Sequence, residues 1–417
     1  MSALFTKPLV TLCFLFSFSA VYAQYVKIDS SLMVTIRIDP GAARGTLVSK
    51  VFEEIDFIPL ETKKESLLGK VKQLEIAENC FVIFDEDTKS IFIFDKTGKF
   101  KTKINEGKIG SNADKKEISG FYGFQLKKEN GITLIQINTK NRSIYFDLDG
   151  NLVKKEPINK EISNIAYIFP ESEMPIKLNQ LIKTKADSSY FELAIFNKKD
   201  QPVASYFPFQ LSKILNDDLI SSGKRFFNYG VLNELFYTRY FENNIYKITP
   251  TNAILAYQII LPEKNSLPKN FIENPIYKGR RMEYFQKNKD KYYGIFNTYI
   301  FGNSLFFNFS SFGYSNKSFI YKLKENQLIS MANLEPDELS SFLPVTDLGV
   351  LDEYKNSGFN LYHDGYLYNS YSSLAMFTLK EQTAGKKIKY NKILTEYFKT
   401  QNKKSNPVII RLKPKLD

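Results

Sequence analysis

Ile-Phe-Ile-Phe-Asp-Lys-Thr-Gly at residues 91–98 is the stretch that decides the fold, and Ile-Tyr-Phe-Asp-Leu-Asp-Gly at residues 144–150 is its second clear copy. Each copy is a run of β-branched and aromatic residues, which favour strands. Each run leads into a turn where an Asp side chain can hydrogen-bond the backbone and a Gly can adopt positive φ. The pattern therefore predicts antiparallel strands joined by tight turns.

Weaker copies of this pattern continue along the chain at residues 193–200, 245–249, 320–324 and 409–413. One equivalent position per copy gives spacings of 52, 50, 52, 75 and 89 residues, measured between Phe94, Phe146, Phe196, Ile248, Leu323 and Leu412. A unit of about fifty residues with several short strands has the size of one four-stranded propeller blade. Six units predict an all-β fold, a six-bladed β-propeller of four-stranded antiparallel blades over residues 48–417.

The last two spacings are longer because extra segments stand within them. Residues 262–290 and 380–400 are predicted to be short helical insertions late in the chain. In the second insertion, one helical face carries an apolar stripe formed by Tyr390, Ile393, Leu394, Tyr397 and Phe398. This stripe predicts a helix packed on its own domain, and a helix lying on a membrane surface is the alternative.

A ring of sheets must also be closed, because an open ring exposes unpaired strand edges. The strand-like residues 31–38 stand ahead of the first unit, whereas the sixth unit ends the chain. We expect residues 24–47 to form an N-terminal segment whose strand joins the blade that contains residues 408–413. That pairing would fasten the ring.

Residues 1–23 have the pattern of a secretory signal peptide. Lys7 supplies a positive start, residues 9–18 are apolar, and Val21 to Ala23 form a small-residue cleavage motif. We expect cleavage after Ala23 and export to the periplasm or the extracellular space. The apolar run is too short to span about 30 Å of hydrocarbon, so no transmembrane segment is expected after cleavage; a membrane anchor is the alternative.

Four stretches carry a family resemblance: residues 48–62, residues 92–100, Asn244 to Ile248 and Asn406 to Ile410. They resemble the six-bladed β-propeller family of exported Bacteroidota proteins, which is related to NHL-type propellers. The resemblance implies a propeller and export, with little about ligands. Residues 105–112 depart from it, since the family often has a glycine-rich stretch ending in Gly-Pro-x-Glu-Tyr there, and nothing known of that loop carries over.

Chemistry-bearing motifs are few. Any triad or dyad with an imidazole must use His363, the only histidine, which flanks the turn at Asp364 and Gly365. Cys80 stands in an apolar run and is expected to be a buried, inert thiol. Neither a metal nor a cofactor is expected, because His and Cys are too few and glycine-rich phosphate loops are missing. No catalytic residue is assigned, and a carboxylate pair for glycoside hydrolysis stays open.

The chain carries 57 Lys and Arg against 45 Asp and Glu, and only eight of the cations are Arg. Nucleic acid is not an expected partner, since Lys is the less specific phosphate ligand and the chain is expected to be exported. Peripheral contact with an anionic envelope surface is an expectation, and a solvated Lys-rich surface is the alternative. Arg280 and Arg281 lie in the first insertion and are predicted, with His363, to contribute to binding.

These observations favour an exported, non-catalytic propeller that binds a protein, peptide or glycan partner at one mouth of its ring. The lack of Trp weakens the glycan option, although Tyr can also stack on sugars. The alternative is a hydrolase or lyase with its active site at the central channel. Propellers can serve either role, so fold alone does not choose between them.

Overall fold

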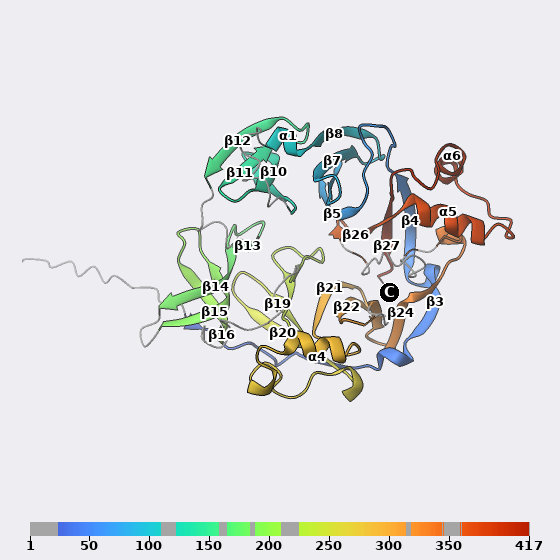
Figure 1. Cartoon of the computed structure of the whole chain (residues 1–417). Coiled ribbons are helices and arrows are strands. Elements are labelled where there is room, and N and C mark those ends of the chain that lie inside the picture. The colour runs from blue at the N-terminus through green and yellow to red at the C-terminus, as the bar shows by residue number, and fades with distance from the viewer. Residues whose placement is uncertain are drawn as a thin grey trace, which may run out of the picture.

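The computed structural model describes residues 24–109, 122–157, 165–183, 188–209, 225–313, 318–343, 345, 359 and 361–416. The predicted signal peptide, with its cleavage site after Ala23, lies outside the described residues. So do residues 110–112, the end of the stretch that differs from the family pattern. The described chain forms six sheets around a central axis (Figure 1). The predicted six-bladed β-propeller is confirmed.

The first three blades follow the chain in order. Blade 1 comprises β5 (Val71–Ala77), β6 (Cys80–Asp85), β7 (Ser90–Asp95) and β8 (Phe100–Ile104). Blade 2 comprises β9 (Gln125–Glu129), β10 (Ile132–Asn138), β11 (Arg142–Phe146) and β12 (Leu152–Pro157). Blade 3 comprises β13 (Ile165–Ile168), β14 (Pro175–Lys183), β15 (Ser188–Phe196) and β16 (Pro202–Phe209).

The last three blades contain the insertions and the closure. Blade 4 comprises β17 (Phe226–Phe227), β18 (Leu235–Thr238), β19 (Asn244–Ile248) and β20 (Ala253–Ile260). Blade 5 comprises β21 (Gly294–Phe301), β22 (Ser304–Ser310), β23 (Ser318–Lys322) and β24 (Gln327–Glu335). Blade 6 comprises β25 (Leu361–His363), β26 (Tyr366–Tyr371), β27 (Val408–Pro414) and, from the N-terminal part of the chain, β4 (Phe52–Pro59).

The repeat positions fall on the third strand of every blade. Five lie within β7, β11, β15, β19 and β27, and Leu323 directly follows β23. The turns after the two clearest copies form as their sequence predicts. Asp95 accepts hydrogen bonds from the backbone N–H groups of Thr97 and Lys99, and Gly98 adopts a φ of +86°. The fifty-residue period therefore marks blades.

The predicted closing strand is wrong. Residues 34–37 form β2 (Val34–Arg37), which runs parallel to β20 of blade 4 and does not reach β27. The strand that closes the ring is β4, which pairs antiparallel with β27 from Val408 opposite Pro59 to Lys413 opposite Glu54. Blade 6 needs an antiparallel fourth strand as long as β27, and the eight residues of β4 match it better than the four of β2.

The segment before β4 runs along the outside of the ring (Figure 1). β1 (Gln24–Tyr25), β2 and β3 (Arg44–Leu47) add parallel fifth strands to blades 3, 4 and 5. Two short 3-10 helices interrupt it, η1 (Pro40–Ala42) and η2 (Val48–Lys50). The chain thus covers three blade edges before it closes the fourth, and covered edges do not recruit other strands.

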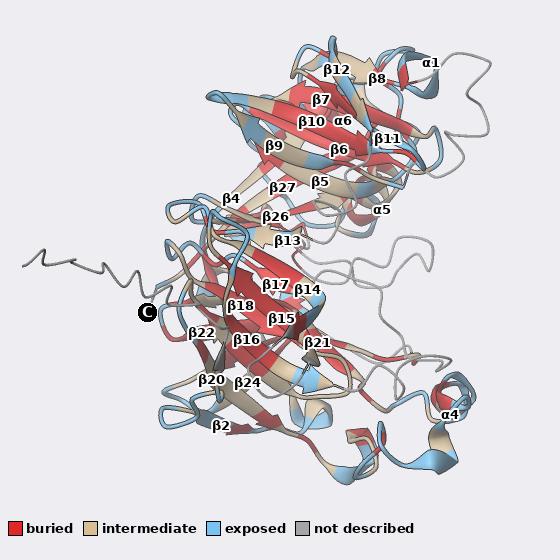
Figure 2. Cartoon of the chain, turned by 90° about the vertical axis from the view of Figure 1, so that its left-hand side faces the viewer, coloured by how far each residue is buried: buried red, intermediate tan, exposed pale blue. Residues whose placement is uncertain are grey.

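The core lies within and between the blades, where the central strands are almost wholly buried (Figure 2). β6 and β7 carry buried residues along nearly their whole length, because they are covered on both faces. Cys80 is a free, buried thiol in β6, and burial raises its pKa. This agrees with the expected inert thiol.

Among the residues that the structure describes, the α-helices are short and, apart from α1 (Glu106–Ile109), late in the chain. The first insertion contains η5 (Glu263–Asn265), η6 (Pro275–Tyr277) and α4 (Arg281–Lys287); η7 (Glu338–Ser340) follows blade 5. The second contains α5 (Ser373–Gln382) and α6 (Lys392–Thr400), so it starts earlier than predicted. In α6 the stripe residues Leu394, Tyr397 and Phe398 are buried on the propeller, whereas Ile393 is 55% exposed.

The ring has two different ends. In an antiparallel blade, one end holds the link between strands one and two and the link between strands three and four. We name this end the turn end. The link between strands two and three and the link to the next blade lie at the other. Both insertions, residues 261–293 and 372–407, are of this second kind, so we name it the insertion end. Figure 2 shows α4 and α5 on one side and the chain's C-terminus on the other.

Candidate functional site: a pocket at the turn end

A pocket of about 350 Å³ opens at the turn end of the ring. Blades 3, 4 and 6 form it, and its lining is Tyr167, Pro170, Asn228, Gly230, Val231, Leu232, Asn233, Tyr362, His363 and Asp364. These residues belong to, or directly follow, the first strands of their blades. Since first strands surround the axis of a propeller, the pocket lies near that axis at the turn end of the ring.

The blade 4 wall is a loop with a defined backbone. The side-chain oxygen of Asn228 accepts a hydrogen bond from the Gly230 N–H at 2.8 Å, and Gly230 has a φ of +89°. Asn233 donates from its amide nitrogen to Glu171 Oε2 of blade 3 at 2.7 Å. The loop is therefore held both by its own turn and by the neighbouring blade.

The blade 6 wall is the turn between β25 and β26. Asp364 and Gly365 both have positive φ, which fits the two-residue hairpin turn expected from their sequence. The Gly365 N–H donates to the Tyr362 hydroxyl oxygen at 3.1 Å. This places the ring of Tyr362 and the imidazole of His363 in the pocket wall.

The imidazole of His363 is half-buried and favours its neutral form. Burial lowers its pKa below the ordinary 6.5, and the positive charge of Lys96 lowers it further, while Asp364 acts in the opposite direction. Lys96 itself lies over the rings of Phe81 and Tyr368. At neutral pH the pocket therefore presents an uncharged imidazole, which can both donate and accept a hydrogen bond.

The lip of the pocket is apolar and accessible. Val231 is 46% exposed and Leu232 is 58% exposed. Tyr167, another lining residue, is partly buried, and its ring packs against Phe169 and Phe226. The site thus combines an apolar lip with an amide, a carboxylate and a neutral imidazole, as in pockets that bind a small ligand or one side chain of a larger one.

Only one of the three predicted binding residues lines this pocket. His363 does, but Arg280 and Arg281 belong to the first insertion, at the other end of the ring. Arg280 is exposed. Arg281 is 1% exposed, and its guanidinium donates to the carbonyl oxygen of Ile272 at 2.5 Å and stacks over Phe271. Arg281 therefore holds the insertion together, a structural role that the sequence pattern did not indicate.

The loop at residues 228–233 was missed by sequence reasoning. Asn-Tyr-Gly-Val-Leu-Asn contains no catalytic or ligand-binding motif. Its only signal is the spacing of Asn and Gly, which is typical of any tight turn. Nothing in the sequence indicates that this loop meets residues 362–364, more than 120 positions away.

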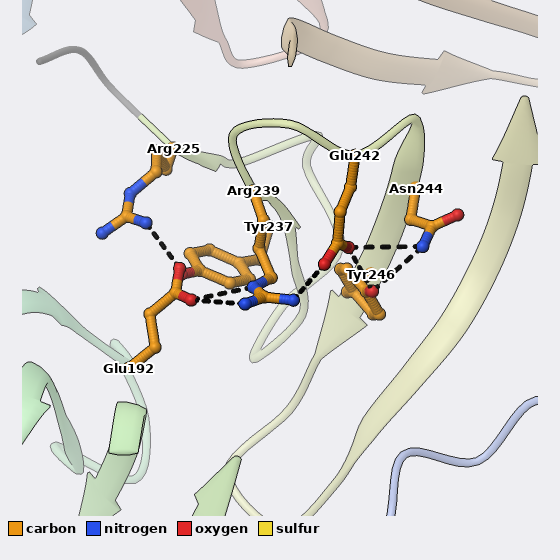
Figure 3. A network of polar contacts seen from close by, with 7 residues as sticks. All are labelled: Glu192, Arg225, Tyr237, Arg239, Glu242, Asn244 and Tyr246. Atoms are coloured by element: carbon orange, nitrogen blue, oxygen red, sulfur yellow. Dashed lines mark hydrogen bonds and ion pairs between the residues drawn. The ribbon is translucent and has the colours of Figure 1, made fainter. Parts of the chain in front are cut away.

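A second polar cluster, the blade 3–4 network, lies between these blades (Figure 3). Arg225, Arg239 and Glu242 stand in links of the insertion end. Glu192 of β15 accepts hydrogen bonds from Arg225 at 2.6 Å, from the Tyr237 hydroxyl at 2.6 Å and from Arg239 at 2.8 Å. Arg239 also pairs with Glu242, which accepts from the Tyr246 hydroxyl at 2.7 Å. Sequence reasoning missed this network, because its members carry no motif.

The charges of this network compensate one another. Burial raises the pKa of Glu192, but the positive charges of Arg239 and Arg225 outweigh burial, so its pKa is lowered overall. Burial and the Glu192 carboxylate together raise the pKa of Tyr237, which therefore stays protonated as a donor. Two arginines and two glutamates with satisfied hydrogen bonds form a structural tie between blades rather than an open binding site.

No group of three or more His, Cys, Asp or Glu side chains in the described part of the chain is arranged to hold a metal ion. In the same residues, no helix is long and apolar enough to cross a membrane.

One solved structure agrees with the fold at a TM-score above 0.5. A crystal structure of a protein from Bacteroides fragilis NCTC 9343, named as exported, superposes with a TM-score of 0.60 at 14% identity, covering 92% of this chain and 100% of the other. A member of the DUF4221 family from Bacteroides vulgatus ATCC 8482 matches with a TM-score of 0.41 at 11% identity, over 88% and 98% of the two chains. No curated protein matches the sequence.

The family model described as "Domain of unknown function (DUF4934)" matches residues 34–413. The match runs from β2 to β27, so it includes all six blades and both insertions. The chain belongs to the DUF4934 family.

Proposed function

We propose that this chain is an exported, non-catalytic propeller that binds a peptide segment of a partner at the turn-end pocket. The observation that carries the proposal is the pocket itself, in which loops from blades 3, 4 and 6 meet near the axis of the ring. Export rests on the signal-peptide pattern of residues 1–23. The likeness to an exported Bacteroides protein supports the fold, and the rest is inferred from this chain.

A peptide fits the pocket chemistry better than a glycan does. The exposed Val231 and Leu232 favour an apolar side chain, whereas sugars usually stack on aromatic faces. The Asp364 carboxylate and the His363 imidazole are suited to the N–H and C=O groups of a peptide backbone. A volume of about 350 Å³ accommodates one or two side chains, so a short segment is the expected ligand.

A peptide and glycan array probed with the chain from residue 24 onward tests this proposal. We expect peptides with an apolar residue to be retained, and Leu232→Glu or Asp364→Asn to abolish their signal. Leu152→Glu is the matched control, because Leu152 is 49% exposed on blade 2 and does not line the pocket. Equal loss in the control, or retention of glycans alone, would contradict the peptide proposal.

A hydrolase or lyase remains the second candidate, and one observation favours it. Asn228, Asn233, His363 and Asp364 line the same pocket near the axis, and an imidazole beside a carboxylate can move a proton. His363→Gln distinguishes the two functions. If the chain turns over a substrate retained on the array, His363→Gln should abolish turnover while leaving retention of that substrate largely intact.

A further inference from the structure

The positive charge of this protein is concentrated in its two insertions. Residues 261–293 contain eight cations and four acids, and residues 372–407 contain eight cations and two acids. Together these 69 residues supply ten of the twelve net positive charges of the chain. The other 348 residues carry 41 cations and 39 acids, so the rest of the propeller is nearly neutral. A general Lys-rich surface does not produce this distribution.

Both insertions belong to the insertion end of the ring, opposite the turn-end pocket (Figure 2). The charged side chains are at the surface there: Lys264, Lys269, Lys278, Arg280, Lys287 and Lys289 are exposed in the first insertion, and Lys386, Lys387, Lys389, Lys392, Lys399, Lys403 and Lys404 in the second. Some pair with acids, as Lys287 does with Glu283 and Lys403 does with Glu381. Six acids cannot neutralise sixteen cations, so this end of the molecule is strongly basic.

Exposed isoleucines accompany the cations in both insertions. Ile272 and Ile276 are 42% and 65% exposed in the first, and Ile276 stands two residues before Lys278 in the chain. Ile393 is 55% exposed in the second, directly after Lys392. Each insertion therefore presents an exposed isoleucine within two residues of a cation in the chain. Basic segments with apolar residues on their outer face are typical of elements that lie in the interfacial layer of a membrane.

Both insertions have apolar packing of their own. In the first insertion, the rings of Phe271, Tyr277, Tyr284 and Phe285 pack on one another with centroids 4.8 to 5.8 Å apart. Below Ile393, the α6 side chains Leu394, Tyr397 and Phe398 are buried on the propeller. The apolar groups that fold each insertion are thus used internally, and the exposed isoleucines are additional to them.

We propose that the insertion end docks the protein on an anionic lipid bilayer. The lysines contact acidic headgroups, and Ile272, Ile276 and Ile393 enter the boundary between headgroups and acyl chains. A bilayer is favoured over an acidic glycan because a polyanion offers no apolar environment in which an isoleucine side chain could be buried. It is favoured over an acidic protein because exposed cations and isoleucines stand on two separate insertions at one end of the ring, and a bilayer is wide enough to reach both. The docked ring holds its turn-end pocket away from the membrane.

Vesicle co-sedimentation of the chain from residue 24 onward tests the docking. We expect the protein to sediment with phosphatidylcholine vesicles containing 30% phosphatidylglycerol and to stay in solution with pure phosphatidylcholine. Each Lys near an anionic surface is worth about 1 kcal/mol, or about fivefold in binding. Lys387→Gln/Lys389→Gln/Lys392→Gln should therefore weaken binding by on the order of a hundredfold, and Ile276→Ser/Ile393→Ser should weaken it at least tenfold.

The matched control removes three lysines from the turn end, Lys99→Gln/Lys199→Gln/Lys324→Gln, each exposed in a turn between the third and fourth strands of its blade. It should bind anionic vesicles within about twofold of the unmodified chain. Equal loss in this control, absence of sedimentation by a folded protein, or equal binding to neutral vesicles would overturn the proposal. The proposal would also be overturned if soluble polyglutamate abolished vesicle binding and Ile276→Ser/Ile393→Ser did not weaken it. That result would assign the basic surface to an acidic protein. Because the pocket lies at the other end, peptide retention in the basic-surface variants shows separately whether the proposed function holds.

Discussion

Gly230 of blade 4 and Tyr362 of blade 6 are in such close contact that a Cβ atom added to Gly230 would lie 2.0 Å from the Tyr362 hydroxyl oxygen. The two residues are 132 positions apart, and blade 5 lies between their blades in the chain. Their contact is possible because first strands converge at the axis of the ring. It also forms part of the wall of the turn-end pocket, so the shape of the pocket depends on a glycine at this position.

Gly230→Ala should lower the free energy of unfolding by about 2 to 4 kcal/mol, since a left-handed φ costs an alanine about 1 kcal/mol and the overlap with Tyr362 adds to that cost. Urea denaturation measures the change. Gly131→Ala is the control, because Gly131 has a φ of +82° with nothing within 4 Å of an added Cβ, so it should lose only about 1 kcal/mol. Adding Tyr362→Phe should restore part of the loss in Gly230→Ala; no restoration would show that the hydroxyl is not the obstacle.

Glu192→Gln should destabilise the fold by about 3 to 5 kcal/mol, because it leaves Arg225 and Arg239 without their shared carboxylate in a buried setting. Glu156→Gln removes an exposed partner of Lys154 and should change the free energy of unfolding far less, because water screens the pair. Denaturant titration of the two variants at neutral pH makes the comparison. Similar values for both would mean that the blade 3–4 network contributes no more than a surface ion pair.

The same carboxylate gives a prediction for acid stability. Because the folded pKa of Glu192 is lowered below its ordinary 4.5, the stability it contributes is complete above that value and is lost as the pH falls through the folded pKa. The free energy of unfolding, followed from pH 6 down to pH 3, should therefore fall more steeply in the unmodified chain than in Glu192→Gln. Parallel curves would contradict the inferred pairing with Arg225 and Arg239.

His363 should titrate below pH 6.5, since burial and Lys96 disfavour its charged form. It is the only histidine, so one imidazole signal in a proton NMR titration reports its pKa without assignment. Its folded pKa is lowered, so the unfolded chain takes up the proton first and stability decreases as the pH falls from 6.5 to the folded value. His363→Gln should remove that decrease, and Lys96→Gln should move the midpoint upward. A midpoint at or above 6.5 would contradict the half-buried placement.

Ile36→Ala should cost about 2 to 4 kcal/mol, because Ile36 in β2 is 1% exposed against blades 4 and 5. Val34→Ala on the same strand is the control, and at 45% exposure it should cost less than about 1 kcal/mol. Thermal unfolding followed by circular dichroism measures both. Removing residues 24–39 should lower the melting temperature and leave a folded ring, whereas removing residues 24–59 should prevent folding, because β4 leaves with them.

Local chemistry in the sequence was sufficient for the blades and their turns. Asp95 and Gly98 determine a turn whatever surrounds them, because the Asp side chain and the glycine φ act within four residues. The regular recurrence of such turns, with buried third-strand positions such as Phe94 and Phe146, predicted the number of sheets. The longer spacings also predicted both insertions, although the second starts earlier than expected. The turn at Asp364 and Gly365, beside His363, could be predicted from the sequence for the same reason.

Contacts between distant residues were decided only by the tertiary structure. The sequence predicted that an N-terminal strand would close the ring, but length and direction of pairing selected β4 over β2 as the neighbour of β27. The pocket wall at residues 228–233, the burial of Arg281 and the pairing of Glu192 with two arginines each depend on which blade faces which. A repeat period sets how many blades form, whereas the side chains that meet across an axis or a blade interface are set by the packing of the closed ring.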